Sequence, residues 1–206
     1  MTQSEPRLER FSAAERVTHW LVALSFLYAA LTGLALWSPR LYWLAAVFGG
    51  GPTVRGWHPW AGVLFAAVFA TMFRAWRRQM RLDADDRLWL RRAHRYAVHD
   101  EQGLPEAGRF NAGQKVLFWA QAAAAILLLS TGVVLWWPEV MPRAWRLAAI
   151  LLHPAAAVFS IAGVILHIYM GTAAVPRAFR GMIQGWVTPK WAASHHPKWR
   201  RQIRGR

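Results

Sequence analysis

The chain has 206 residues, with 25 Lys and Arg against 10 Asp and Glu, no cysteine, and a hydrophobic fraction of 55%. This composition excludes a disordered chain and a disulfide scaffold, and the lack of cysteine excludes thiolate-held zinc, iron–sulfur clusters and a cysteine nucleophile. The formal charge of +15 is typical of proteins that bind nucleic acid. We nevertheless expect no nucleic-acid partner, because the chain also carries apolar runs long enough to cross a bilayer.

Four stretches are apolar over about the 20 residues that a helix needs to cross the ~30 Å hydrocarbon core of a membrane. They predict spans at about residues 17–37, 57–76, 115–137 and 149–172. Their apolar residues show neither strict alternation nor a single stripe, a pattern typical of helices that face lipid. The sequence therefore predicts an all-α membrane protein: residues 1–206 form a single membrane domain, a four-transmembrane-helix bundle without an internal repeat.

Basic residues gather on one side of the predicted bundle. Of the 25 Lys and Arg residues, 21 lie on one side: before the first span, after the fourth, or between the second and third, counting Arg74 and Lys115 at the facing ends of those two spans. Cytoplasmic segments collect Lys and Arg, so both termini, the connection at 77–114 and the tail at 176–206 are expected in the cytoplasm. The protein is expected to be a multi-pass protein of the bacterial inner membrane. Residues 82–99 of the connection are expected to form one or two surface helices.

Four of the eight histidines fall in or at the edges of the spans, where ionisable groups are costly and usually functional. His19 and His167 lie toward the cytoplasmic side, and His58 and His153 toward the outer side. His153 and His167 are 14 residues apart, so in a helix they point within about 40° of each other and lie ~21 Å apart along the axis. Two tiers of paired imidazoles predict two b-type haems, each held by histidines from different helices. Hydrogen bonding between helices is the alternative role for each histidine.

Small and basic residues near these histidines fit the same hypothesis. Gly33, Gly62 and Gly163 would leave room for flat macrocycles, although glycine also serves helix packing in membranes. Arg16 and Arg55 each precede a histidine by three residues and could pair with haem propionates. For Arg16, a positive flank that follows the charge rule is an equally good explanation.

The other histidines, together with two prolines, receive simpler interpretations. His94 and His99 in the connection, and His195 and His196 in the tail, are expected to be solvated or to face a partner. Pro154 directly follows His153 and would kink a helix that begins near Leu147, whereas Pro59 is expected to fall where its span has hardly begun.

The residues that carry a resemblance run from RFSAAERVTHW through WHPWAG, RFNAGQKVLFW and LHIYM to GMIQGWVTPKWAASHHPKW. Over nearly its whole length the chain resembles the cytochrome b gamma subunit of membrane-bound respiratory formate dehydrogenase. The resemblance implies that His19 and His167 bind the haem on the cytoplasmic side and that His58 and His153 bind the outer haem. It also implies a quinone pocket, for menaquinone or ubiquinone, formed by Asn111 and Gly113 with Gln114 as neighbour. From the residues alone, Asn111 is by default a helix cap.

The same resemblance implies the route of the electrons. They would come from formate, oxidised by a molybdenum or tungsten catalytic alpha subunit, through an iron–sulfur beta subunit to the outer haem, and then to quinone near the cytoplasmic face. This chain would be the quinone-reducing subunit of the complex and would contain no formate-oxidising site; a higher oligomer of the complex is possible. One alternative is a cytochrome b subunit of a nickel–iron hydrogenase or of a thiosulfate reductase-like complex. The other is a haem-free membrane anchor or transporter, in which the histidines pack helices or relay protons.

Overall fold

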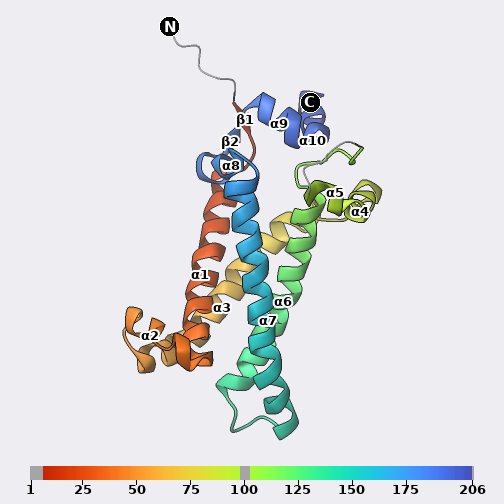
Figure 1. Ribbon diagram of the computed structural model, residues 1–206. Coiled ribbons are helices and arrows are strands. Elements are labelled where there is room, and N and C mark those ends of the chain that lie inside the picture. The colour runs from red at the N-terminus through yellow and green to blue at the C-terminus, as the bar shows by residue number, and fades with distance from the viewer. Residues whose placement is uncertain (1–6, 98–102, 206) are drawn as a thin grey trace. The chain divides into compact units, whose positions relative to one another are not determined.

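A computed structural model of the protein describes residues 7–97 and 103–205, with the side chains of 96 and 97 left undescribed. His99 therefore lies outside the described residues. Four helices are long and apolar enough to cross a membrane (Figure 1). They are α1 (Ala13–Trp37), α3 (Gly51–Trp76), α6 (Ala112–Trp136) and α7 (Arg143–Tyr169), the last continued by the π-helical turn η2 (Met170–Ala174).

Two of these helices begin well before the predicted spans. Helix α3 begins at Gly51, so Pro59 lies inside it rather than near its start, and the expectation for this proline is wrong. Pro52 explains the early start, because a proline in the first turn has no intrahelical hydrogen bond to lose. Helix α7 begins at Arg143 and stays helical through Pro154.

The chain divides into two compact units. The bundle unit comprises Val17–Arg74 and Ala120–Leu166, and the loop–tail unit comprises Met1–Arg16, Ala75–Trp119 and His167–Arg206.

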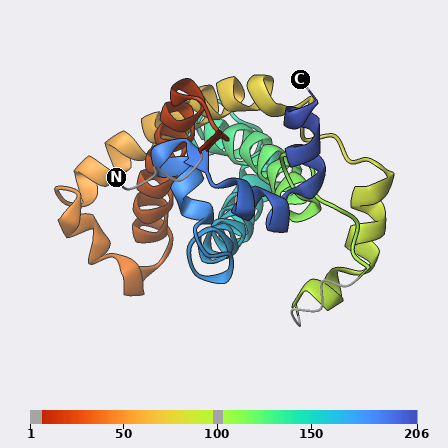
Figure 2. The same cartoon turned by 90° about the horizontal axis from the view of Figure 1, so that it is seen from above.

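Figure 2 shows the helices from above. Aromatic and polar contacts join those of the bundle unit in pairs. Phe26 of α1 packs on Phe65 of α3 with ring centroids 5.5 Å apart, and Trp60 of α3 packs edge-on against Trp136 of α6. Between α6 and α7, the Gln121 amide nitrogen donates to the Ser160 carbonyl at 3.0 Å, and the Ser160 hydroxyl donates to the Gln121 side-chain oxygen. Such interhelical hydrogen bonds are typical of helices that associate in lipid.

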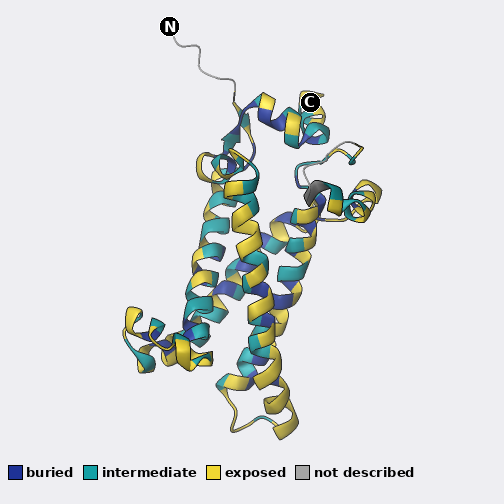
Figure 3. Ribbon diagram, viewed as in Figure 1, coloured by how far each residue is buried: buried dark blue, intermediate teal, exposed yellow. Residues whose placement is uncertain are grey.

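Large apolar side chains stand exposed along the same helices (Figure 3). Leu24 is 61% exposed, and both Ile126 and Leu151 are 72% exposed. Exposure of this extent suits hydrocarbon and would be unfavourable in water. The short helices η1 (Pro39–Leu41) and α2 (Leu44–Val47) lie between α1 and α3 in the chain, and α2 packs on both long helices through a small core of Ala35, Ala45 and Val54.

The loop–tail unit joins the two ends of the chain. Strand β1 (Leu8–Glu9) pairs antiparallel with β2 (Trp186–Val187), with Leu8 opposite Val187. Helices α4 (Ala84–Arg91) and α5 (Ala93–Ala97) form in the connection, as expected for residues 82–99. The tail folds into α8 (Ala178–Gln184), α9 (Pro189–His195) and α10 (Pro197–Arg204), and its core holds Val187, Trp191, Ala192 and Trp199.

Candidate functional site

Two of the four predicted histidines meet inside the bundle unit. His58 comes from α3 and His153 from α7, and their ring centroids lie 6.3 Å apart with the ring planes at 78°. Both side chains are partly buried. The bundle thus brings together the two residues that the sequence places in the outer tier.

Each of these imidazoles is hydrogen-bonded to a buried threonine of the neighbouring helix. Thr32 of α1 places Oγ1 3.0 Å from His58 Nδ1, and Thr131 of α6 places Oγ1 2.9 Å from His153 Nδ1. Each hydroxyl also lies in donating distance of a carbonyl in its own helix, that of Tyr28 at 2.7 Å or of Leu127 at 2.6 Å.

These contacts decide which ring nitrogen carries the proton. A hydroxyl has one hydrogen to donate, and here it goes to the backbone carbonyl one turn earlier. The threonine oxygen then accepts from Nδ1–H, so Nε2 of each neutral imidazole keeps its lone pair. Both histidines are therefore held in the tautomer that can bind a metal through Nε2.

Glycine follows threonine in both helices and lets the imidazole approach closely. A Cβ atom on Gly33 would lie 3.0 Å from His58 Cε1, and one on Gly132 would lie 3.4 Å from His153 Cε1. A Thr-Gly pair on one helix and a His-Pro pair on the next therefore occur twice in the chain. This recurrence of two dipeptides is the sequence signal that points to Thr32 and Thr131.

The remaining residues predicted to pack against the haems or to pair with the outer haem lie on α3 and α7. Arg55 is exposed on α3 one turn before His58, and a Cβ atom on Gly62 would meet no protein atom within 4 Å. Gly163 lies on α7, partly buried. The structure thus leaves space at Gly62, whereas Gly33 directly faces a histidine ring.

The residues predicted on the cytoplasmic side are divided between the two units. His19 lies on α1 in the bundle unit, and His167 on α7 is the first residue of the last segment of the loop–tail unit. Their pairing stays a prediction. Arg16, in the loop–tail unit, donates from Nη1 to the Ile183 carbonyl at 2.6 Å and thus braces the last turn of α8.

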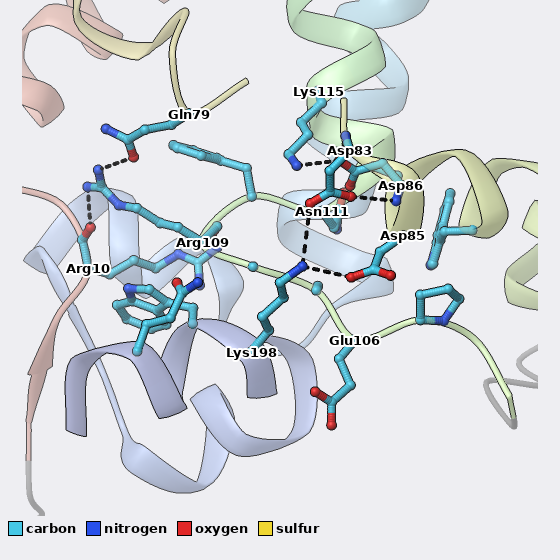
Figure 4. A pocket seen from close by; sticks show the side chains of 18 of the residues that line it. Arg10, Gln79, Asp83, Asp85, Asp86, Glu106, Arg109, Asn111, Lys115 and Lys198 are labelled. Atoms are coloured by element: carbon cyan, nitrogen blue, oxygen red, sulfur yellow. Dashed lines mark hydrogen bonds and ion pairs between the residues drawn. The ribbon is translucent and has the colours of Figure 1, made fainter. Parts of the chain in front are cut away.

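A charged cavity of about 700 Å³ lies in the loop–tail unit (Figure 4). Its lining includes Asn111 and the ion pair of Lys115 with Asp86, whose side chains are only 8% and 9% exposed. At the same cavity, Lys198 reaches Asp85 at 2.7 Å. The cavity therefore offers both donors and acceptors to a polar group.

Asn111 caps helix α6. Its Oδ1 accepts from the Gln114 backbone N–H at 2.9 Å, and the Gln114 side-chain oxygen accepts from the Asn111 N–H at 3.0 Å. Of the three residues predicted for a quinone pocket, Asn111 lines the cavity, whereas Gly113 and Gln114 are not among its lining residues. The Asn111 amide nitrogen has no hydrogen-bond partner in the described part of the chain, and it remains available as a donor.

His196 is buried, contrary to the expectation that it is solvated or faces a partner. It is 3% exposed, its Nδ1 donates to the Gly108 carbonyl at 2.6 Å, and its Nε2 accepts from Arg10 Nη2 at 2.9 Å. Burial, followed by the charge of Arg10, lowers the pKa of His196 to about 3. Burial and the charge of Arg109 lower the pKa of Arg10 to about 9. His196 is therefore a neutral residue that joins the tail to the connection.

His195, by contrast, is partly buried beside Trp191, and His94 is exposed.

Comparison with known proteins identifies the fold family. A profile described as prokaryotic cytochrome b561 matches residues 10–185. The chain belongs to this cytochrome b family. It is 38% identical to the formate dehydrogenase cytochrome b556(fdo) subunit of Escherichia coli (strain K12), over 95% of this chain and 92% of that protein. It is 31% identical to the formate dehydrogenase cytochrome b556 subunit of Haemophilus influenzae, over 97% and 84%. It is also 33% identical to the nitrate-inducible cytochrome b556(Fdn) subunit of Escherichia coli, over 92% and 88%.

Membership in this cytochrome b family and the four apolar helices establish a multi-pass protein of the inner membrane, and the family implies haem b.

The outer histidine pair, His58 and His153, fits a haem. Metal-to-histidine bonds of about 2.0–2.1 Å place two imidazole centres roughly 6 Å apart across one metal, close to the spacing of His58 and His153. Among residues 7–97 and 103–205, no group of three or more His, Asp or Glu side chains is arranged to hold a metal ion. Two histidines suffice for a haem, whose porphyrin supplies the other four iron ligands.

Proposed function

We propose that this chain is the dihaem cytochrome b subunit of a formate dehydrogenase complex, and that it carries electrons across the inner membrane to quinone. The observation that carries the proposal is the outer pair, His58 and His153, with both Nε2 atoms left as acceptors by threonine hydrogen bonds. His58 and His153 would hold the haem, which would then supply one-electron transfer rather than oxygen chemistry.

The second haem is proposed between His19 and His167. His167 lies 14 residues after His153 on α7, about four turns along a continuous helix. This separation corresponds to ~21 Å along the axis, which suits two haems stacked across a membrane. Arg55, exposed one turn before His58, is the proposed partner of a propionate of the outer haem.

Quinone reduction is proposed beside the cavity of the loop–tail unit. A quinone carbonyl needs a hydrogen-bond donor, and the Asn111 amide nitrogen has no partner in the described chain. The Asp86–Lys115 ion pair and the exposed residues Asp85 and Lys198 line the same cavity, so it has polar groups through which protons from water can arrive. Gly113 and Gln114, the other residues that the resemblance implies, lie in the first turn of α6 beside Asn111.

The named relatives support the identity of the donor. All three are cytochrome subunits of formate dehydrogenases. We infer that an iron–sulfur subunit passes electrons from a molybdenum or tungsten catalytic subunit to the outer haem. With 21 of 25 basic residues on the side of the termini, both ends are inferred to be cytoplasmic.

Haem content per chain tests the core of the proposal. We expect the purified complex to give a b-type alpha band in its reduced-minus-oxidised spectrum and two haems per copy of this chain. His153→Ala should lose one haem, whereas His94→Ala, at an exposed position on α5, should keep both. Absence of haem in the wild type would contradict the proposal, and a co-purifying nickel–iron subunit would contradict the formate assignment.

Asn111 can be tested as a quinone donor separately from its role as a helix cap. Asn111→Asp keeps an oxygen for the Gln114 N–H and removes the amide donor, whereas Asn111→Ala removes both. If Asn111 donates to quinone, both variants should keep both haems and should reoxidise them with quinone at least tenfold more slowly than the wild type. Normal turnover in Asn111→Asp would limit Asn111 to capping α6.

A further inference from the structure

The two threonines that contact the outer histidines suggest how the potential of this site is set. We propose that Thr32 and Thr131 are positioning residues that lower the reduction potential of the outer haem and fix the near-perpendicular orientation of its axial imidazoles. The inference rests on the proposed function, because it takes His58 and His153 as the ligands. It goes further in assigning a role to two residues outside the ligand set.

Burial makes these hydrogen bonds permanent features of the site. Thr32 is fully buried at 0% exposure, and Thr131 is 7% exposed. At such positions the threonine oxygen is a buried acceptor for Nδ1–H. A backbone carbonyl of the same helix, that of Ala29 for His58 and that of Leu128 for His153, accepts from the ring as well. The backbone carbonyl holds the hydroxyl hydrogen in both cases, which prevents the hydroxyl from donating to the ring instead.

Comparison with other threonines in the long helices shows that these two are special. Thr71 of α3 also donates to a carbonyl of its own helix, that of Val68 at 2.6 Å, but it is exposed and contacts no histidine. Back-bonding to the helix is thus ordinary for threonine. The additional contact with an imidazole occurs at Thr32 and again at Thr131, one for each ring of the pair.

The chemical consequence follows from the direction of the hydrogen bond. An imidazole that donates Nδ1–H to an oxygen becomes a more basic ligand at Nε2. A more basic axial ligand stabilises ferric over ferrous iron and therefore lowers the reduction potential. With such a bond on both ligands, the outer haem has a low reduction potential, which suits a group that passes electrons on.

The same contacts fix the orientation of the rings. Each ring is held by threonine at Nδ1 and lies against the adjacent glycine, Gly33 or Gly132. These constraints explain why the ring planes keep an angle of 78°. Near-perpendicular axial imidazoles give low-spin ferric haem a strongly anisotropic electron paramagnetic resonance signal, so that signal reports the orientation independently of the potential.

The test uses the full-length chain in the intact complex, with redox titration of the haem alpha bands and low-temperature spin resonance. Thr32→Val and Thr131→Val keep the shape of the side chain and remove the hydroxyl acceptor, so that only the backbone carbonyl of Ala29 or of Leu128 remains for the ring. We expect each to raise the midpoint potential of the outer haem, by a change of up to tenfold in its one-electron equilibrium constant, or about 59 mV. Thr32→Ser and Thr131→Ser should restore the wild-type potential, and Thr71→Val is the matched control. The outer haem is identified by its loss in His153→Ala.

Each outcome decides the inference. A raised outer potential with a less anisotropic signal, both restored in the serine variants, supports it. Unchanged potential and signal in both valine variants would overturn it. If the wild type shows no b-type haem at all, the proposed function fails; a normal dihaem spectrum with no effect of either threonine overturns only this inference.

Discussion

His196 illustrates how a single tail residue can hold distant segments together. Its ring lies between the Gly108 carbonyl and the Arg10 guanidinium, and Arg10 also donates to the Arg109 carbonyl at 3.2 Å. The guanidinium carbon of Arg10 lies 4.8 Å from the ring centroid of Trp191 and 5.5 Å from that of Trp199. A protonated His196 would place a second positive charge against Arg10 and would lose its acceptor at Nε2.

These contacts predict an acid-sensitive loop–tail unit. Burial and Arg10 lower the pKa of His196 to about 3, whereas an unfolded histidine titrates near 6.5. Below pH 6.5 the unfolded chain binds a proton that the folded chain does not, so stability is present above that pH and is lost progressively as the pH falls toward 3. We expect a loss of about 2 kcal/mol between pH 7 and pH 5.

The measurement is the thermal unfolding midpoint in detergent at pH 7 and pH 5. His196→Asn is the informative variant, because an amide can donate to the Gly108 carbonyl and accept from Arg10 without titrating. Its midpoint should fall less on acidification than that of the wild type. Equal falls in the two proteins would show that other groups cause the acid sensitivity.

At the level of single residues, the sequence predicts only part of the site. His58 and His153 were recognisable because an imidazole is costly inside an apolar segment. Thr32 and Thr131 were not, since threonine is common in membrane helices and its partner cannot be inferred from one helix alone. His196 was misjudged because its surroundings, Arg10 and Gly108, are brought to it only by the tertiary fold.

Among the helices, α4 is linked to α6 by the buried ion pair of Asp86 and Lys115. Asp86 also forms a capping box with Asp83 at the start of α4, each carboxylate accepting from the other residue's N–H at 2.9 Å. With both side chains under a tenth exposed, each charge is compensated mainly by the other. Loss of one partner leaves the other as an uncompensated buried charge.

This pair predicts strong coupling in a double-mutant cycle. Asp86→Asn and Lys115→Met should each destabilise the protein by about 3–5 kcal/mol, and the double variant should be more stable than either single one. The exposed pair of Lys198 and Asp85 is the control, since its removal should cost about 1 kcal/mol or less. Thermal unfolding measures all of these variants. Additive effects of Asp86→Asn and Lys115→Met would contradict the assignment.

The long helices were predictable and their starts were less so. Apolar length identifies all four, but the Gly-Gly-Gly-Pro run at 49–52 suggests a loop, and α3 nevertheless begins at Gly51. The start of α7 at Arg143 is likewise not predictable from hydrophobicity, because polar residues precede the apolar run. Hydrophobicity defines the part of a helix in lipid, whereas capping and turn geometry define where its hydrogen bonds begin.

For the whole molecule, the charge distribution predicts the orientation in the membrane. The natural lack of cysteine makes a single introduced thiol a unique label. Arg40→Cys, after α1, should react with a membrane-impermeant maleimide added to intact spheroplasts. Ser194→Cys, in α9, should react only after the membrane is permeabilised. Both positions are exposed, so the reverse pattern would place the termini outside.

Strand β1 imposes an order on how the protein matures. Leu8 and Glu9 leave the ribosome before their backbone partners, Trp186 and Val187, are made, and all four membrane-spanning helices lie between them in the sequence. The Arg10 and Phe11 amides likewise wait for the Gly185 carbonyl. The leading segment must therefore stay unpaired until all four membrane crossings have been translated. A nascent chain that stalls before the tail emerges would expose this segment to proteases and chaperones.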